Sequence, residues 1–357
     1  MLAPRIIALD GMGGDHGPAV VLGGAAISLQ RHPNLTFLIA GKPAELEAEL
    51  EKHPALKART KILPTETVVS MHDKPSQALR RGKGTSMWLA LDAVAKGEAH
   101  VAVSAGNTGA LMAMSKLILR PMKGIERPAI AALWPTVEAE CIVLDVGANI
   151  GATARQLGDF AILGAAMARA LFHIERPTVA LLNVGVEEIK GADEVKQAHA
   201  WLKGASGLAM TYKGFVEGHQ IGQGAADVVV VEGFAGNIAL KTAEGTARQV
   251  GQYLKDAMMR SWSSKLGAFL ARGGFRVLKH KMDPRRVNGG TFLGLNGIAI
   301  KSHGGTDDVG FASAVDLGYE MAESGLVERL AADIDAFHVA LGAALDEKPQ
   351  DAPAQPG

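Results

Sequence analysis

The stretch Ile6-Ile7-Ala8-Leu9-Asp10-Gly11-Met12-Gly13-Gly14-Asp15-His16-Gly17-Pro18 decides the fold class, because it joins an apolar strand, a glycine turn and a helix start. Glycines let a backbone approach a ligand closely, and a proline fits the first turn of a helix. The free N–H groups of such a helix start face any anion in the turn. The stretch matches neither GxGxxG nor a P-loop, so a plain tight turn stays open beside a phosphate loop.

The same pattern of strand, turn and helix recurs along the chain. Short apolar runs predict strands at 5–9, 35–40, 100–104, 129–134, 141–146, 178–184, 227–231 and 298–301. Helical patterns are expected at 19–30, 86–96, 108–119, 155–172 and 237–255. These repeated units predict an α/β fold with a doubly wound, mostly parallel sheet and helices on both faces. Residues 1–345 are expected to form this domain, and 346–357 a disordered tail.

The composition limits the classes of function. With 357 residues, 48% of them hydrophobic, the chain can bury a large core. Its zero net charge gives no case for nucleic-acid binding. The single cysteine, Cys141, excludes an intrachain disulfide and lies in an apolar run, where an inert buried thiol is expected. Neither a signal peptide nor a membrane span is found, so a cytoplasmic protein is expected.

Polar turns follow several of the predicted strands. They contain Ser104-Ala-Gly-Asn-Thr108, Asp145-Val-Gly-Ala-Asn149, Asn183 to Lys190, and Glu232-Gly-Phe-Ala-Gly-Asn237 with Lys241 one helical turn later. Ligands of open α/β sheets bind outside the carboxyl ends of strands. We therefore expect these turns to line one cleft, although any single one is compatible with ordinary turn chemistry.

Together these motifs identify a family. The chain resembles the bacterial acyl-ACP:phosphate acyltransferases of phospholipid synthesis from Asp10-Gly-Met-Gly-Gly-Asp to Ser302-His303-Gly304, including Glu126-Arg127-Pro128-Ala129 and Leu293-Gly-Leu-Asn-Gly297. The resemblance implies transfer of a long acyl chain from acyl carrier protein to inorganic phosphate, giving acyl phosphate, with no cofactor. It also implies a homodimer and a fold related to phosphotransacetylases and isocitrate or isopropylmalate dehydrogenases. His219, Glu232 and Asn288 depart from the residues common in the family.

The chemistry of this reaction fits the lack of an evident nucleophile. Phosphate is anionic near neutral pH, and a thiolate with a pKa of about 8.5 leaves without much acid assistance. Direct attack therefore needs positioning and charge stabilisation more than covalent catalysis. No GxSxG elbow is present, and the sequence shows no base beside Ser104.

Candidate site residues follow from the turns and the resemblance. For phosphate and the acyl thioester we predict binding by Gly11, Gly13, Gly14, Ser104, Asn107 and Thr108, with Arg127 and Lys190 as second choices. The predicted catalytic residues are Asn149 and Asn237 as donors to the carbonyl oxygen, Lys241 as a phosphate ligand, and His303 as a donor or weak acid. A structural role is expected for Asp10 and Asp15. The sequence has no metal-ligand motif, so no metal ion is expected.

Residues 255–286 form a segment of unusual charge. The segment contains nine Lys and Arg residues but only two Asp residues, which gives it a net charge of +7, and apolar side chains recur at every fourth position. We predict a helical hairpin, interrupted at Gly273-Gly274, that lies on an anionic bilayer through Trp262, Leu266, Phe269, Leu270 and Phe275. Docking of the acidic carrier protein and ordinary core packing are the alternatives.

A membrane location suits the expected product, because a long-chain acyl phosphate is amphiphilic and its consumer is expected to be a membrane-bound glycerol-3-phosphate acyltransferase. The enzyme is then expected at the inner face of the cell membrane. Three other functions are alternatives for this sequence: a short-chain phosphotransacetylase that uses coenzyme A, a dehydrogenase on the related fold, and a non-catalytic scaffold on a lipid surface. The polar strand-end turns argue against a scaffold, which needs no polar cleft.

Overall fold

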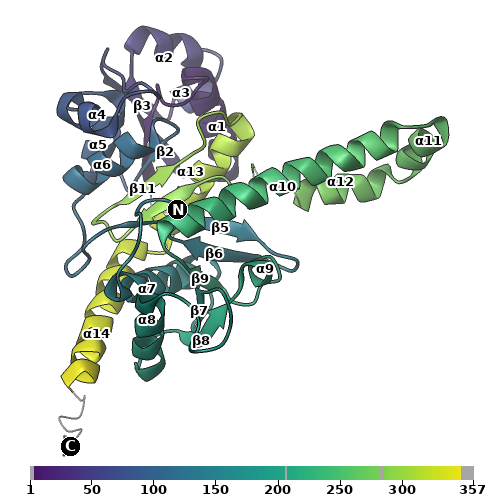
Figure 1. Ribbon diagram of the computed structural model, residues 1–357. Helices are drawn as coiled ribbons and strands as arrows, with labels where there is room; N and C mark the ends of the chain where they lie inside the picture. The colour runs from purple at the N-terminus through teal and green to yellow at the C-terminus, as the bar shows by residue number, and fades with distance from the viewer. Residues whose placement is uncertain (1–3, 206, 282, 284, 286, 347–357) are drawn as a thin grey trace, which may run out of the picture.

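The computed structural model describes residues 4–346 except 206, 282, 284 and 286, and its centre is an eleven-stranded sheet (Figure 1). The strands are β1 (Arg5–Asp10), β2 (Leu35–Gly41), β3 (Thr60–Pro64), β4 (Val101–Ser104), β5 (Ala129–Pro135), β6 (Glu140–Leu144), β7 (Thr178–Leu182), β8 (Thr211–Val216), β9 (Val228–Val230), β10 (Gly290–Leu293) and β11 (Ile298–Lys301). The sheet order is β3-β2-β1-β4-β11-β10-β5-β6-β9-β7-β8.

Helices connect most of these strands. They are α1 (Pro18–Arg31), α2 (Pro43–Leu50), α3 (Pro54–Lys57), α4 (Pro75–Arg81), α5 (Ser86–Ala95), α6 (Thr108–Ile118), α7 (Ala154–Leu171), α8 (Asp193–Gly204), α9 (Gly218–Ile221), α10 (Gly233–Met259), α11 (Trp262–Leu270), α12 (Arg272–Lys281), α13 (Asp308–Glu323) and α14 (Leu326–Asp346). Many of them begin with a cap or proline that suits a helix start, such as Pro18 in α1 and the Thr153–Gln156 capping box before α7.

The sheet is mostly parallel, as predicted, but three successive pairs in its middle are antiparallel. The pairs β11–β10, β10–β5 and β5–β6 are antiparallel, and the other pairs are parallel. Three successive reversals make the half that contains β4 run opposite to the half that contains β6. The carboxyl ends of the two halves therefore do not share one edge of a flat sheet.

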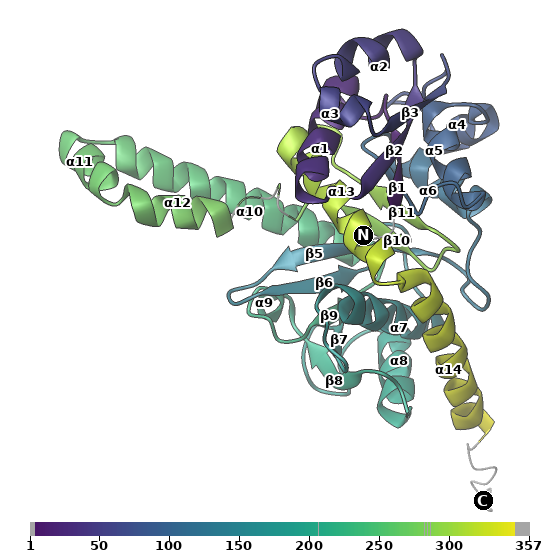
Figure 2. The ribbon, with the colours of Figure 1, turned by 180° about the vertical axis from the view of Figure 1, so that it is seen from behind.

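Two apolar layers cover the two faces of the sheet. In β1, Ile7 and Leu9 pack into one layer while Ala8 between them packs into the other, as the two-residue period of a strand requires. Helices α1, α13, α7 and α14 contribute to the first layer, and α5 and α6 to the second. Figure 1 and Figure 2 show helices on both faces, which confirms the doubly wound architecture.

The predicted strands are all present, with small shifts at their ends, while three further strands were not predicted. These are β3 and β8, the two edge strands, and the short strand β10. The prediction of a disordered tail at 346–357 falls almost wholly outside the described residues.

The outer part of α10 projects from the body together with α11 and α12 (Figure 1, Figure 2). We call residues 249–281 the arm. The hairpin breaks at Ala271, between α11 and α12, just before the predicted break at Gly273-Gly274, and both glycines lie in the first turn of α12. A second break precedes α11 at Ser261, whose Oγ accepts from the Ser264 N–H at 3.1 Å and caps that helix. No helix in the described part of the chain is long and apolar enough to cross a bilayer.

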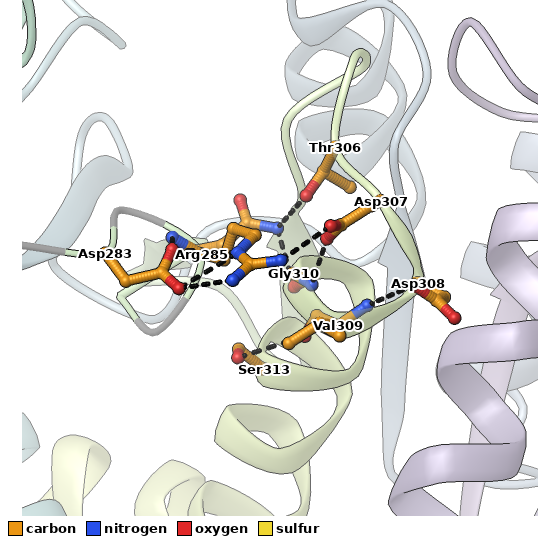
Figure 3. A network of polar contacts seen from close by, with 9 residues as sticks. Asp283, Arg285, Thr306, Asp307, Asp308, Val309, Gly310 and Ser313 are labelled. Atoms are coloured by element: carbon orange, nitrogen blue, oxygen red, sulfur yellow. Dashed lines mark hydrogen bonds and ion pairs between the residues drawn. The ribbon is translucent and has the colours of Figure 1, made fainter. Parts of the chain in front are cut away.

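The chain returns from the arm to the body through an ion-paired segment (Figure 3). Arg285 donates to both carboxylate oxygens of Asp283 and, at 2.8 Å, to Asp307. Asp307 also caps α13, because its Oδ1 accepts from the Gly310 N–H at 3.0 Å. These contacts fix the end of the arm beside the loop that follows β11.

Candidate active site

Three loops meet where neighbouring strands of the first half-sheet end. Residues 10–15 follow β1, 104–107 follow β4 and 302–304 follow β11; we call them the loop cluster. The Ser302 N–H donates to the Ser104 carbonyl at 2.9 Å, and the Asp15 N–H donates to the Gly304 carbonyl at 2.9 Å. The loop at the start of the chain is thereby bonded to a loop nearly 300 residues away.

Glycines make the close fit of the loop cluster possible. A Cβ at Gly13 would lie 2.8 Å from the Gly106 nitrogen, and one at Gly14 would lie 2.9 Å from the Gly304 carbonyl oxygen. Gly14 also has φ of +90°, which other residues rarely adopt. The loops can therefore interlock only without side chains at these two positions.

A buried polar pair lies under the loop cluster. The Ser104 hydroxyl donates to Asp10 Oδ2 at 2.7 Å and accepts from the Gly106 N–H at 3.0 Å. Burial raises the pKa of Asp10, while bonds from Ser86 and Ser104 lower it. Both Ser104 and Asp10 are buried. An acceptor beside Ser104 thus exists in space although not in the sequence, but burial under the glycine loop favours a supporting role for Ser104 over the predicted contact with substrate.

Asn107 and Thr108 begin α6 at the edge of the loop cluster. Asn107 caps the helix by accepting from the Ala110 N–H at 3.0 Å, and its amide donates to the carbonyls of Met71 and Asp73 at 2.9 and 3.0 Å. Both amide hydrogens of Asn107 are therefore used, and its role in this geometry is to hold the loop at 71–73. Thr108 is exposed at the first residue of α6, where it can meet a ligand.

The base of α10 brings two charged side chains, Lys241 and Glu244, to His303 of the loop cluster. Glu244 binds Lys241 at 2.9 Å and His303 Nε2 at 3.4 Å. Partial burial of the imidazole, then the charge of Lys241, lower the pKa of His303, although more than half of its side-chain surface is exposed. Lys241 and His303, which were predicted for separate reasons, therefore lie together, and Glu244 is a neighbour that the sequence did not reveal.

Lys301 is a second lysine at the loop cluster, and the sequence analysis did not predict it. Its Nζ donates to the Ala105 carbonyl at 3.2 Å and to the Ser302 carbonyl, between two loops of the cluster. Burial lowers the pKa of Lys301 to about 8, against the opposing charges of Asp10 and Asp15. Its position directly before Ser302-His303-Gly304 was the one signal that could have drawn attention to it.

Asn288 supports the loop after β11. Its amide donates to Ser302 Oγ at 2.8 Å and to the Gly310 carbonyl at 2.7 Å, and its oxygen accepts from the His303 N–H at 3.1 Å. Asn288 is buried. It departs from the residue common in the resembled family, yet here it fixes the backbone that carries His303.

A second group of turns surrounds Asp145, after β6. Both carboxylate oxygens of Asp145 accept bonds from backbone N–H groups, and Asn149 donates its two amide hydrogens to Asp145 Oδ2 and the Pro128 carbonyl, each at 2.9 Å. Asn149 is buried. Its donors are occupied, so this geometry counts against the predicted oxyanion role and assigns it to loop support.

Helix α10 connects the two groups of turns. A Cβ at Gly236 would lie 1.9 Å from the Asp145 carbonyl oxygen, so the helix begins directly on that loop. Exposed Asn237 lies beside Gly147, and Lys241 follows one turn later on the same side. Gly236 and Glu244 are eight positions apart, which is about 12 Å along the helix. Asn237 and Lys241 are therefore placed between the two halves of the molecule.

The remaining predicted residues adjoin strands β7 and β5, outside the group β1, β4 and β11 that carries the loop cluster. Lys190 is exposed and pairs with Glu187 at 2.8 Å in the loop after β7. Arg127 is exposed before β5, next to the Pro128 carbonyl that Asn149 holds. The antiparallel pairs in mid-sheet reverse the strand direction, so the predicted turns form two groups, which the base of α10 connects.

One surface hollow lies at the end of β6 and β9 that is opposite to the Asp145 turn. It measures about 570 Å³ and is lined by Glu140 and Asp227, which stand where β6 and β9 begin, the opposite strand ends. Its acidic lining is unsuited to an anion. Within the described residues, no three His, Cys, Asp or Glu side chains gather as a metal site would require.

Comparisons with known proteins assign the chain to a family. The model of the family described as fatty acid synthesis protein matches residues 6–329. The phosphate acyltransferases of Afipia carboxidovorans and Xanthobacter autotrophicus are each 62% identical, over 91% and 92% of this chain and 92% and 93% of the relative.

Solved structures resemble the fold at lower identity. A phosphotransacetylase from Streptococcus pyogenes has a TM-score of 0.59 at 18% identity, covering 90% of this chain and 94% of that one. A 4-hydroxythreonine-4-phosphate dehydrogenase from Klebsiella pneumoniae has a TM-score of 0.52 at 16% identity, covering 90% and 99%. At this identity they establish the fold alone, whereas the closer relatives identify the activity: the chain belongs to the phosphate acyltransferase family and is an acyltransferase.

Proposed function

We propose that the protein transfers a long-chain acyl group from acyl carrier protein to inorganic phosphate, giving acyl phosphate for glycerolipid synthesis. The observation that carries the proposal is the meeting of Lys241, Lys301 and the glycine-rich loop cluster, whose described residues include no exposed serine or cysteine. Lysine side chains and backbone N–H groups are suited to bind a phosphate. Thr108 and the start of α6 complete the rim of this site.

In the proposed reaction, phosphate attacks the thioester directly, without an acyl-enzyme intermediate. An oxygen of hydrogen phosphate attacks the thioester carbonyl carbon, the carbon–sulfur bond breaks, and the proton of the phosphate leaves with the carrier thiol. Negative charge develops on the carbonyl oxygen in the transition state, where preorganised donors lower the barrier. Exposed Asn237 and Lys241 lie on the side of α10 toward the turns, so they are our candidates for these donors.

The exposed apolar side chains of the arm support contact with a membrane. Trp262 and Leu270 are 87% and 76% exposed, and Leu266 and Phe269 are also exposed, while Phe275 is partly buried. Apolar side chains on a basic helical hairpin are typical of contact with an anionic bilayer. We propose peripheral attachment to the inner face of the membrane, near a membrane-bound glycerol-3-phosphate acyltransferase.

Two other partners remain for the arm. A homodimer would bury the same apolar side chains, because exposed patches of this kind mark interaction sites. The basic residues suit the acidic carrier protein as well. A coenzyme A-dependent short-chain phosphotransacetylase is the second candidate function, favoured by the fold shared with the Streptococcus pyogenes enzyme.

Product trapping distinguishes these functions. Purified protein is incubated with long-chain acyl-ACP and phosphate, and acyl phosphate is trapped with hydroxylamine, with long-chain and short-chain acyl-CoA in parallel. The proposal predicts phosphate-dependent product from acyl-ACP. Product from short-chain acyl-CoA alone would favour the second candidate, and no product from any donor by folded protein would overturn both.

A further inference from the structure

Lys301 is held at the junction of two loops of the cluster. Its ammonium donates to the carbonyls of Ala105, after β4, and Ser302, after β11. Those two loops are themselves joined by the bond from the Ser302 N–H to the Ser104 carbonyl. An ammonium has three hydrogens, so two carbonyls leave one free for a ligand.

The two lysines that the sequence predicted for the site have carboxylate partners. Lys241 pairs with Glu244 at 2.9 Å, and Lys190 pairs with Glu187 at 2.8 Å. Lys301 forms no ion pair within 4.0 Å among the described residues, although it is less exposed than either. A desolvated ammonium without a paired anion is unfavourable for the folded protein.

We propose that Lys301 binds the phosphate substrate and holds it against the turns at 11–14 and 104–108. This inference rests on the proposed function and names the residue that binds its second substrate. The incoming phosphate supplies the negative charge that the ammonium lacks, and Lys241, at the exposed edge of the same site, is left to face the thioester carbonyl. Charge-assisted bonds from lysine to phosphate are among the strong polar contacts of proteins.

Charged groups on several elements act on Lys301. Asp10 at the end of β1 and Asp15 in the following loop favour the ammonium, whereas burial and Lys241 on α10 disfavour it, so its pKa is about 8. The imidazole of His303, on the following loop, has a lowered pKa and adds no full charge near neutral pH. Phosphate affinity should therefore fall as the pH rises through about 8 and Lys301 loses its proton.

The test compares Lys301→Met, which keeps the length of the side chain, with Lys301→Arg, which keeps its charge. Phosphate binding to the free enzyme is measured by calorimetry without any acyl donor, and KM values are measured for both substrates. We expect Lys301→Met to weaken phosphate binding by about 100-fold and to change the donor KM less than 2-fold. Lys301→Arg should retain more binding and lose the decline near pH 8.

Lys61→Met is the matched control, because Lys61 is an exposed strand lysine on β3, and it should behave as wild type. Folded Lys301→Met that binds phosphate like wild type would overturn the inference. If Lys301→Met does not fold, wild-type phosphate affinity that stays constant from pH 7 to pH 9 would overturn it equally. Because binding is measured without a donor, failure of the proposed acyl transfer gives a different result from failure of this assignment.

Discussion

The loop cluster and the arm are opposites within one chain. In the loop cluster, buried Asp10 and Ser104 bond to each other, and glycines allow backbone contacts that no side chain would permit. In the arm, large apolar side chains such as Trp262 and Leu270 are exposed. The fold itself thus holds the loop cluster together, and we propose a small anion as its ligand, whereas exposed apolar surface like that of the arm is typical of a site for a macromolecular or membrane partner.

Helix α10 belongs to both regions. Its base carries Asn237, Lys241 and Glu244 into the site, and its outer turns form the stem of the arm. Substitutions along this one helix can therefore separate the two regions experimentally, since position on the helix decides which region is affected.

The largest effect is expected at the start of α10. Gly236→Ala places a Cβ 1.9 Å from the Asp145 carbonyl oxygen, so the helix must shift away from the loop. We expect a loss of roughly 2 to 4 kcal/mol of stability and a deep loss of turnover. Gly245→Ala, on the same helix with open space around its Cβ, should stabilise the protein by about 1 kcal/mol. Thermal unfolding and acyl-phosphate assays of both variants measure this contrast, and equal behaviour would contradict it.

Removing the Lys241 ammonium should have the next largest effect. Lys241→Ala should lower turnover about 100-fold with folding and dimerisation intact, as the loss of a donor in the transition state does. Lys255→Ala, on the exposed outer part of the same helix, should retain wild-type turnover with a soluble donor. Steady-state rates with phosphate varied provide the measurement, and unchanged kinetics for Lys241→Ala would remove it from the site.

The arm should respond in the opposite way. Replacing Trp262, Phe269 and Leu270 together by serine should weaken binding to anionic vesicles by at least about 100-fold, because exposed apolar surface provides the contact. Turnover of a soluble donor should change less than 2-fold. Vesicle sedimentation measures the first quantity. If wild-type protein does not sediment with vesicles, the arm contacts a second copy or the carrier protein instead.

A smaller effect is expected in the pH profile. Burial and neighbouring lysine charge lower the pKa of His303, so its imidazole stays neutral at pH 7 and turnover should fall only below the ordinary histidine pKa of about 6.5. Glu244 opposes this shift, so Glu244→Gln should move the acidic limb to still lower pH. Rates from pH 5 to pH 8 test both statements, and an acidic limb above pH 7 would contradict them.

Local sequence patterns predicted most of the fold and less of the site. The strands were found because buried parallel strands are short apolar runs, as in β4 and β9, whereas the edge strand β3 carries the exposed Lys61 and gave a weak signal. The reversal in mid-sheet depends on pairing between distant strands, which no local pattern encodes.

The site shows the same limit. The turn at residues 11–14 lies near Lys241 and His303. The sequence could indicate these positions because the turn and His303 each follow a strand and Lys241 lies near the start of a helix. The contact of Lys301 with Ala105 joins residues 196 positions apart, and that of Ser104 with Asp10 joins residues 94 apart. Such pairs can be recognised only after the chain has folded. The occupied amide of Asn149 could likewise not be seen in a motif.

The central claim is that phosphate bound at the loop cluster attacks the thioester directly. Initial rates with acyl-ACP and phosphate both varied test it most directly. Direct transfer predicts intersecting double-reciprocal lines, and no acyl group on the protein when phosphate is withheld. Parallel lines, with acyl-enzyme recovered from the quenched reaction, would contradict the account. Ser104 would then be the candidate nucleophile, with Asp10, which accepts its hydrogen bond, as the base.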